Sequence, residues 1–132
     1  MITLDTSAVV ALVNRSDVRH GEAARALGDH GGPTVVPLAI LAEVADVLDG
    51  RLGPIATVGF LRGLEQGDSL LDCGDGDVPR IRELMARFTD PPLGFTGAAV
   101  VACAERNGGD VLTFDRRVLD AVAHEVPVSL VP

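Results

Sequence analysis

The sequence predicts an α/β domain in which a mainly parallel sheet is covered by helices on both faces. Short apolar strand segments alternate along the chain with helical segments, and this alternation is typical of parallel sheets. Hydrophobic residues make up 47% of the chain and aromatic residues 3%, so the core is expected to consist of Val, Leu, Ile and Ala. The length of 132 residues, without a repeat or a linker, predicts a single domain over residues 1–132.

The first half of the chain is expected to contain two strands and four helices. An apolar strand over 2–4 ends at Asp5, and a helix follows over 6–14. A second helix is expected over 17–27 with Asp17 as N-cap, then a turn over 28–33 and a strand over 34–36. Pro37 is expected in the first turn of a helix that runs to about residue 49, and Pro54 at the start of a helix that ends near residue 67.

The second half is expected to contain three strands and three helices. The strands are predicted over 69–71, 111–114 and 126–131, and the helices over 77–88, 97–107 and 116–124. Gly108 and Gly109 are expected to stop the second of these helices, and the following strand ends at Asp115. All four phenylalanines are expected in the core: Phe60, Phe88, Phe95 and Phe114.

Charge and cysteine usage restrict the class of protein. The net charge is −8, and all 11 basic residues are Arg, so a broad basic surface for nucleic acid is not expected. A bound metal or a basic partner would offset this charge, and the alternative is that it only keeps the protein soluble. Cys73 and Cys103 form no CxxC pair, which favours free thiols in a reducing compartment. The first residues show neither a signal peptide nor a membrane span, so a cytoplasmic protein without a membrane partner is expected.

Two carboxylates follow strands in this reading. If the strands that end at Asp5 and Asp115 are neighbours in a parallel sheet, both side chains emerge at its carboxyl edge, where ligands bind. Two adjacent carboxylates repel each other, and a hard divalent cation such as Mg²⁺ relieves that repulsion and binds phosphate. The alternative for each residue alone is an ordinary helix cap. The combination of the two therefore carries the prediction of a metal site.

Glu43 is the third candidate for this site. Ala39, Leu41, Ala42 and Val44 surround it in the sequence, and an acid in apolar surroundings usually has a partner or a metal. The alternative is an exposed position on an amphipathic helix, as expected for Asp46 and Asp49.

Three motifs, in order, resemble the PIN-domain nucleases and the VapC-type toxins of bacterial toxin–antitoxin pairs. They are Leu4-Asp5-Thr6-Ser7-Ala8, Leu41-Ala42-Glu43-Val44 and Leu112-Thr113-Phe114-Asp115. The resemblance implies a three-layer α/β/α fold and endonucleolytic cleavage of RNA. It implies that Asp5, Glu43 and Asp115 hold Mg²⁺ or Mn²⁺, with the hydroxyls of Thr6 and Thr113 beside them. It also implies a homodimer and a cognate antitoxin protein.

The chain departs from the family pattern at Gly97. The family has a further Asp at the start of this helix, whereas here the segment reads Thr96-Gly97-Ala98. The missing carboxylate predicts weaker metal binding, and a loss on the order of 10²-fold in rate is expected. A catalytically weakened or inactive PIN domain that still binds antitoxin or RNA is therefore the second hypothesis. A receiver or phosphatase fold is the third, and the absence of Lys argues against it.

Substrate and partner surfaces are predicted less sharply. Arg116 and Arg117 follow Asp115 directly and are candidates for phosphate contacts, because Arg binds phosphate bidentately. Aromatic residues for stacking single-stranded bases are scarce, which favours a structured RNA. The helices over 39–48 and 55–64 carry more apolar residues than one buried face needs, so an amphipathic antitoxin helix is expected there.

Overall fold

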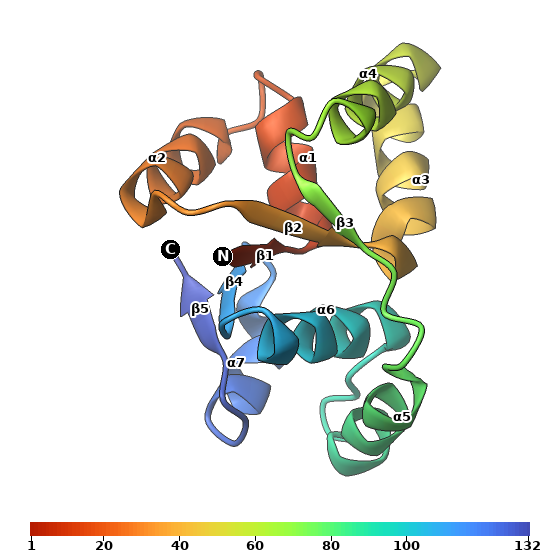
Figure 1. Cartoon of the computed structure of the whole chain (residues 1–132), viewed down its shortest axis with the longest axis vertical. Helices are drawn as coiled ribbons and strands as arrows, with labels where there is room; N and C mark the ends of the chain where they lie inside the picture. The colour runs from red at the N-terminus through yellow and green to blue at the C-terminus, as the bar shows by residue number, and fades with distance from the viewer.

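The computed structural model describes residues 1–132, and its centre is a five-stranded parallel sheet (Figure 1). The strands are β1 (Ile2–Leu4), β2 (Thr34–Pro37), β3 (Leu70–Asp72), β4 (Asp110–Leu112) and β5 (Ser129–Val131). Their spatial order is β3-β2-β1-β4-β5, and every neighbouring pair is parallel. The predicted fold class, a three-layer α/β/α arrangement around a parallel sheet, is confirmed.

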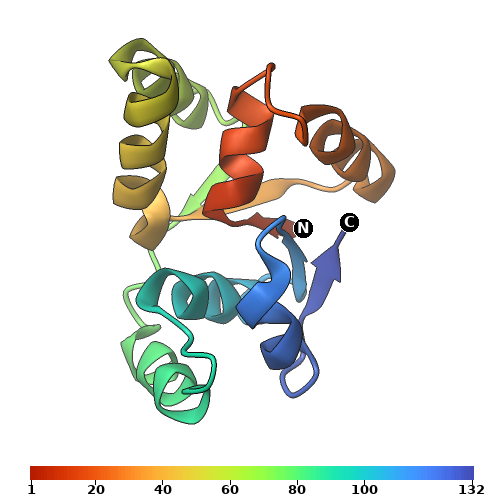
Figure 2. The same cartoon turned by 180° about the vertical axis from the view of Figure 1, so that it is seen from behind.

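Helices cover both faces of the sheet. They are α1 (Thr6–Val13), α2 (His20–His30), the 3-10 helix η1 (Leu38–Ile40), α3 (Leu41–Leu52), α4 (Pro54–Glu65), α5 (Val78–Arg87), α6 (Phe95–Arg106) and α7 (Arg116–Ala123). Helices α1 to α4 lie on one side of the sheet, and α5 to α7 lie on the other, as Figures 1 and 2 show. None of these helices has the length and apolar character that crossing a bilayer requires.

The order of the strands explains the two layers. Parallel crossovers are nearly always right-handed, so a chain that reverses its direction across the sheet changes the face its helices cover. This chain moves from β1 outward to β3, and then returns to β4 beside β1. The point between β1 and β4 is therefore the switch point at which parallel sheets bind ligands.

The core lies where α1 and α6 cover the central strands. Ile2, Leu4, Val111 and Leu112 are buried on β1 and β4. Helix α6 buries a run of small residues from Ala98 to Ala104, and it packs against β1, β2 and β4. Small side chains let the helix backbone approach the sheet closely, which places the start of α6 beside the carboxyl edge of β1.

Two helix starts differ from the expectation. Helix α2 begins at His20 with Arg19 at the N-cap, and Asp17 instead accepts a hydrogen bond from the Arg19 backbone N–H at 2.8 Å in the preceding turn. Pro37 closes β2 opposite Asp72 rather than opening a helix, because η1 intervenes before α3.

Two expectations about the second half are also corrected. Strand β4 ends at Leu112, so Asp115 lies beyond the strand as the N-cap residue of α7. Phe95 is 51% exposed and is not a core residue, whereas Phe60, Phe88 and Phe114 are half-buried against the core. Phe95 opens α6 on the outer side of the helix, and position alone did not distinguish it from the others.

Candidate active site

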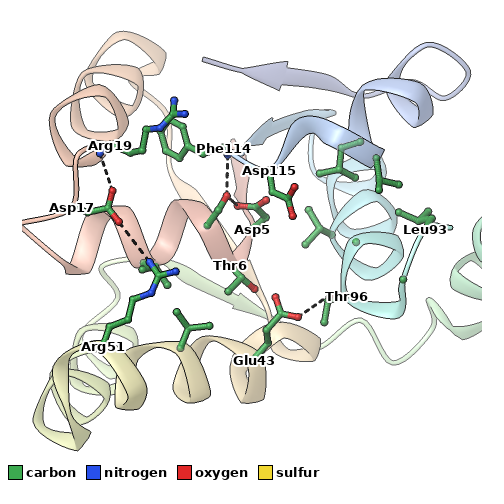
Figure 3. Close-up of a pocket in the computed structure, with 18 residues that line it drawn as sticks. Asp5, Thr6, Asp17, Arg19, Glu43, Arg51, Leu93, Thr96, Phe114 and Asp115 are labelled. Atoms are coloured by element: carbon green, nitrogen blue, oxygen red, sulfur yellow. Dashed lines mark hydrogen bonds and ion pairs between the residues drawn. The ribbon is translucent and has the colours of Figure 1, made fainter. Parts of the chain in front are cut away.

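A pocket of about 380 Å³ opens at the carboxyl edge of the sheet (Figure 3). It is bounded by α1, α3, the start of α6 and the segment that joins β4 to α7. Asp5, Glu43 and Asp115, which the sequence predicts as site residues, all line it. Residues 5, 43 and 115 are thus brought to one cavity from three elements.

Asp5 stands at the junction of β1 and α1. It is 8% exposed, and its Oδ1 accepts hydrogen bonds from the Ser7 hydroxyl at 2.7 Å and from the Ala8 backbone N–H at 2.9 Å. Its Oδ2 accepts a hydrogen bond from the hydroxyl of Thr113. Asp5 is therefore a helix cap, which was the alternative interpretation of its sequence position. It also faces the pocket, and one lone pair of its Oδ2 accepts no hydrogen bond.

Thr113 and Ser7 join the two halves of the chain at this point. The Thr113 hydroxyl donates to Asp5 and accepts from the Asp115 backbone N–H at 3.0 Å. The Ser7 hydroxyl donates to Asp5 and accepts from the Phe114 backbone N–H at 2.9 Å. Both hydroxyls therefore fix the segment 113–115 against the end of β1.

Asp115 has no such restraint on its carboxylate. It is exposed, and its side chain makes no capping hydrogen bond to α7. Helix capping by the side chain therefore does not explain an acid at position 115. Burial raises the pKa of Asp5, although its hydrogen bonds act in the opposite direction, and the negative charge of Asp115 raises it further. The two carboxylates thus lie close enough to repel each other.

Glu43 approaches the pocket from α3 on the opposite wall. It is exposed rather than enclosed by its apolar sequence neighbours, which is the arrangement that the alternative reading proposed. Its Oε2 accepts a hydrogen bond from the Thr96 hydroxyl of α6 at 3.1 Å. Figure 3 shows this pair on the side of the pocket that faces Asp5 and Asp115.

Thr6 carries an unsatisfied polar atom at the site. Its Oγ1 is buried and has no hydrogen-bond partner, so it bonds none of the three acids. In Figure 3 Thr6 lies between Asp5 and Glu43. A buried hydroxyl without a partner is costly, and a bound water, ion or phosphate would satisfy it.

The donor set fits a divalent cation held by few protein ligands. No group of three or more His, Cys, Asp or Glu side chains is gathered closely enough to hold a metal, so Glu43 stands apart from the pair Asp5 and Asp115. Mg²⁺ is usually held by one or two carboxylates and completed by water and phosphate. The repelling pair and the orphaned Thr6 hydroxyl match that pattern.

The α6 wall of the pocket is apolar where a further acid was expected. A Cβ added at Gly97 would lie 2.9 Å from Cδ1 of Leu93 and 3.9 Å from Cδ2 of Leu119. Leu93 is 4% exposed and lines the pocket. The volume beside Gly97 is therefore filled by Leu93, and a larger residue at 97 requires that leucine to move.

The cations at the pocket are not those that the sequence suggested. Arg116 turns to Asp120 and to the Pro132 carbonyl, and neither Arg116 nor Arg117 lines the cavity. Arg19 and Arg51 line it instead.

Sequence reasoning had a usable signal for Arg51. Glu43, Val47 and Arg51 are spaced by four residues, so they follow one face of α3, and all three line the pocket. The other functional side chains that it missed are Ser7, Asp17, Arg19 and Thr96, which stand at turns or helix ends where no periodicity marks them.

Comparisons with known proteins show which proteins this chain is similar to. The PIN domain family model matches residues 2–125. Ribonuclease VapC26 of Mycobacterium tuberculosis is 27% identical over 121 residues, which is 90% of each chain. The crystal structure of Mycobacterium tuberculosis VapC20, described as a sarcin–ricin loop cleaving toxin, has a TM-score of 0.79 at 25% identity and covers 92% of this chain and 95% of that one.

A more distant structure shares the fold. VapBC2 of Rickettsia felis, bound to a DNA fragment from its promoter, has a TM-score of 0.70 at 13% identity, over 98% of this chain and 97% of that chain. Because the family match extends over nearly all of the sequence, the chain belongs to the PIN domain family.

Proposed function

We propose that this protein is a Mg²⁺- or Mn²⁺-dependent endoribonuclease and the toxin of a toxin–antitoxin pair. The observation that supports this most directly is the pair of adjacent carboxylates, Asp5 and Asp115, which no cationic side chain neutralises. Acids left in this state at a sheet's switch point are the chemistry that a divalent ion and a phosphodiester require. The family and the ribonuclease relative support the same activity.

The proposed roles of the residues follow from their contacts. Asp5 and Asp115 would hold the ion, and Glu43 would face it from the opposite wall of the pocket. When bound, the ion would polarise the attacking water and stabilise negative charge on the phosphate. Thr113 and Ser7 hold Asp5 in place, and Thr6 has a free hydroxyl to donate to water or phosphate. Glu43 Oε1, which Thr96 leaves free, is the atom proposed to take the proton of the attacking water.

A structured RNA is the proposed substrate class. The pocket contains one aromatic side chain, Phe114, so a run of stacked single-stranded bases has little to bind to. The similar protein VapC20 is described as a sarcin–ricin loop cleaving toxin, so its named target is a loop. Recognition through shape and backbone phosphates is consistent with both facts.

The proposed antitoxin contact lies on α3 and α4. Helix α4 has no buried residue, and Ile55 and Val58 are 86% and 53% exposed on it. Leu52 and Leu61 extend this apolar strip, to which an amphipathic helix of the antitoxin would bind. The mass of the protein in solution, measured alone and with its antitoxin, tests both the apolar strip and the proposed homodimer. Ile55→Asp should abolish antitoxin binding, and unchanged binding would refute the assignment of this surface.

Cleavage with a matched pair of variants tests the activity. Total cellular RNA and a sarcin–ricin hairpin are incubated with the protein and Mg²⁺ or Mn²⁺. Asp115→Asn removes one charge from the pocket, whereas Asp120→Asn removes one from the outer face of α7. We expect the unaltered chain and Asp120→Asn to cut, and Asp115→Asn to be slower by about 10²-fold or more. Equal cleavage by all three would exclude this pocket as the active site.

Gly97 supports a second candidate function, a PIN domain that binds without cutting. Leu93 fills the volume beside Gly97, so the site is built without the further acid. The double variant Gly97→Asp with Leu93→Ala supplies both the carboxylate and the room for it. If only this double variant cuts RNA, the native protein is a binding protein. If the native chain already cuts, its present acids suffice.

A further inference from the structure

We propose that Arg51 and Arg19 bind the RNA phosphates on either side of the bond that is cut. This inference rests on the proposed ribonuclease function and identifies how the same pocket holds its substrate. Arg51 comes from α3 and Arg19 from the turn before α2, so they approach the pocket from two different elements.

The charge of the pocket requires cations at its mouth. Four of the side chains that line it are acids, and only Arg19 and Arg51 are bases. A divalent ion would offset the charge at the carboxylates, but the neighbouring phosphates of an RNA chain would still meet a negative rim. Guanidinium groups are suited to this position because their forked N–H donors match phosphate oxygens.

Arg51 is free to make such a contact. Its side chain is 60% exposed, and its one ion pair is a long contact of 3.9 Å from Nη1 to Oδ2 of Asp17. Asp17 is only 16% exposed and is fixed by the Arg19 backbone N–H. Asp17 therefore restrains Arg51 at the pocket through one long contact and leaves most of its donors free. Figure 3 marks this ion pair.

Arg19 is held on the other side of Asp17. Its guanidinium carbon lies 5.3 Å from the centre of the Phe114 ring, and Phe114 directly precedes Asp115. Its only ion pair is at 3.5 Å with Glu22, and both side chains of that pair are exposed. Stacking restricts the motion of the side chain while its edge N–H groups stay available for a phosphate.

Four of the other arginines form ion pairs elsewhere. Arg80, Arg87, Arg106 and Arg116 form closer ion pairs with acids outside the pocket. Arg82 on α5 forms no ion pair and lies outside the pocket, so Arg82→Ala removes the same charge without touching the site.

The test measures RNA affinity and cleavage together. A labelled sarcin–ricin hairpin is titrated in EDTA at several salt concentrations with the unaltered chain, Arg51→Ala, Arg19→Ala, Arg51→Lys and Arg82→Ala. We expect each pocket alanine variant to weaken binding roughly 5- to 10-fold at 0.1 M salt and to lower the salt slope by about 0.7 to 0.9. Arg51→Lys should keep the slope and lose part of the affinity, because the charge stays and the fork is lost.

The cleavage data separate the two proposals. With Mn²⁺, Arg51→Ala should raise KM while kcat changes less than threefold, and Arg82→Ala should match the unaltered chain. If the unaltered chain binds and cuts while both pocket variants behave like Arg82→Ala, the arginine proposal is overturned and the nuclease function stands. If the unaltered chain neither binds nor cuts RNA, both fail.

Discussion

Two pairs of acids in this protein have opposite surroundings. Asp72, the last residue of β3, and Asp77 both bind the guanidinium of Arg106, at distances from 2.7 to 3.1 Å. The pKa of Asp72 is held below its ordinary value, chiefly by the hydrogen bond from Arg106. Asp5 and Asp115 have no cation, and burial raises the pKa of Asp5.

The difference separates a structural pair from a functional one. At Arg106 the negative charges are satisfied by the chain itself, so they stabilise the contact between β3, α6 and the segment before α5. At Asp5 the fold keeps a buried carboxylate with no cationic side chain beside it. An unpaired charge in such a position is evidence of a binding role, because it reduces the stability of the isolated fold.

The largest expected effect comes from Asp5→Asn. Cleavage should fall on the order of 10³-fold, since the position loses the charge that holds the ion. The amide oxygen can still accept from Ser7 and Ala8, whereas the amide nitrogen cannot accept from the Thr113 hydroxyl. The metal-free protein should be as stable as the unaltered chain or more so, because the buried charge is gone. Single-turnover kinetics and urea unfolding measure the two quantities. A large loss of stability would mean that Asp5 acts mainly as a helix cap.

Arg106→Ala should reduce stability and leave cleavage intact, which is the reverse of the result expected for Asp5→Asn. It leaves Asp77, which is 8% exposed, and Asp72 without their partner. We expect the free energy of unfolding to fall by about 2 kcal/mol, near the low end for broken pairs because the Arg106 side chain is 44% exposed. Cleavage per folded molecule should not change. Arg82→Ala is the control, and an equal loss of stability there would remove the distinction.

The smallest effect is the dependence of stability on pH. The folded pKa of Asp72 lies below its ordinary value of 3.8, so the unfolded chain takes up this proton first as the pH falls. The stabilisation is therefore complete well above pH 3.8 and is lost as the pH falls through that value toward the folded pKa. Urea midpoints measured between pH 6 and pH 3 should fall more steeply for the unaltered chain than for Asp72→Asn. An equal dependence of the urea midpoint on pH in both proteins would show that the Asp72–Arg106 pair contributes little to stability.

The sequence was sufficient for the elements whose signal is local. Alternating apolar segments predicted the parallel sheet, and the strands predicted over 2–4 and 111–114 directed attention to the acids that follow them, Asp5 and Asp115. The first bounds are confirmed, whereas β4 ends at Leu112. The burial and the contacts of individual side chains could not be predicted from these local patterns. Phe95 is exposed, Arg116 turns to the Pro132 carbonyl and Leu93 fills the space beside Gly97. These outcomes depend on side-chain direction and on packing in three dimensions, which the apolar pattern of the sequence does not give.

The hydrogen bond between Thr113 and Asp5 joins residues 108 positions apart, and it has a consequence for biosynthesis. A ribosome has made most of the 132 residues before Thr113 leaves it, and β4 cannot pair with β1 any earlier. Nascent or prematurely released chains that end before residue 110 therefore contain Asp5 and Glu43 but cannot assemble the pocket. The acidic site therefore first appears only after translation has passed β4 and the segment that follows it.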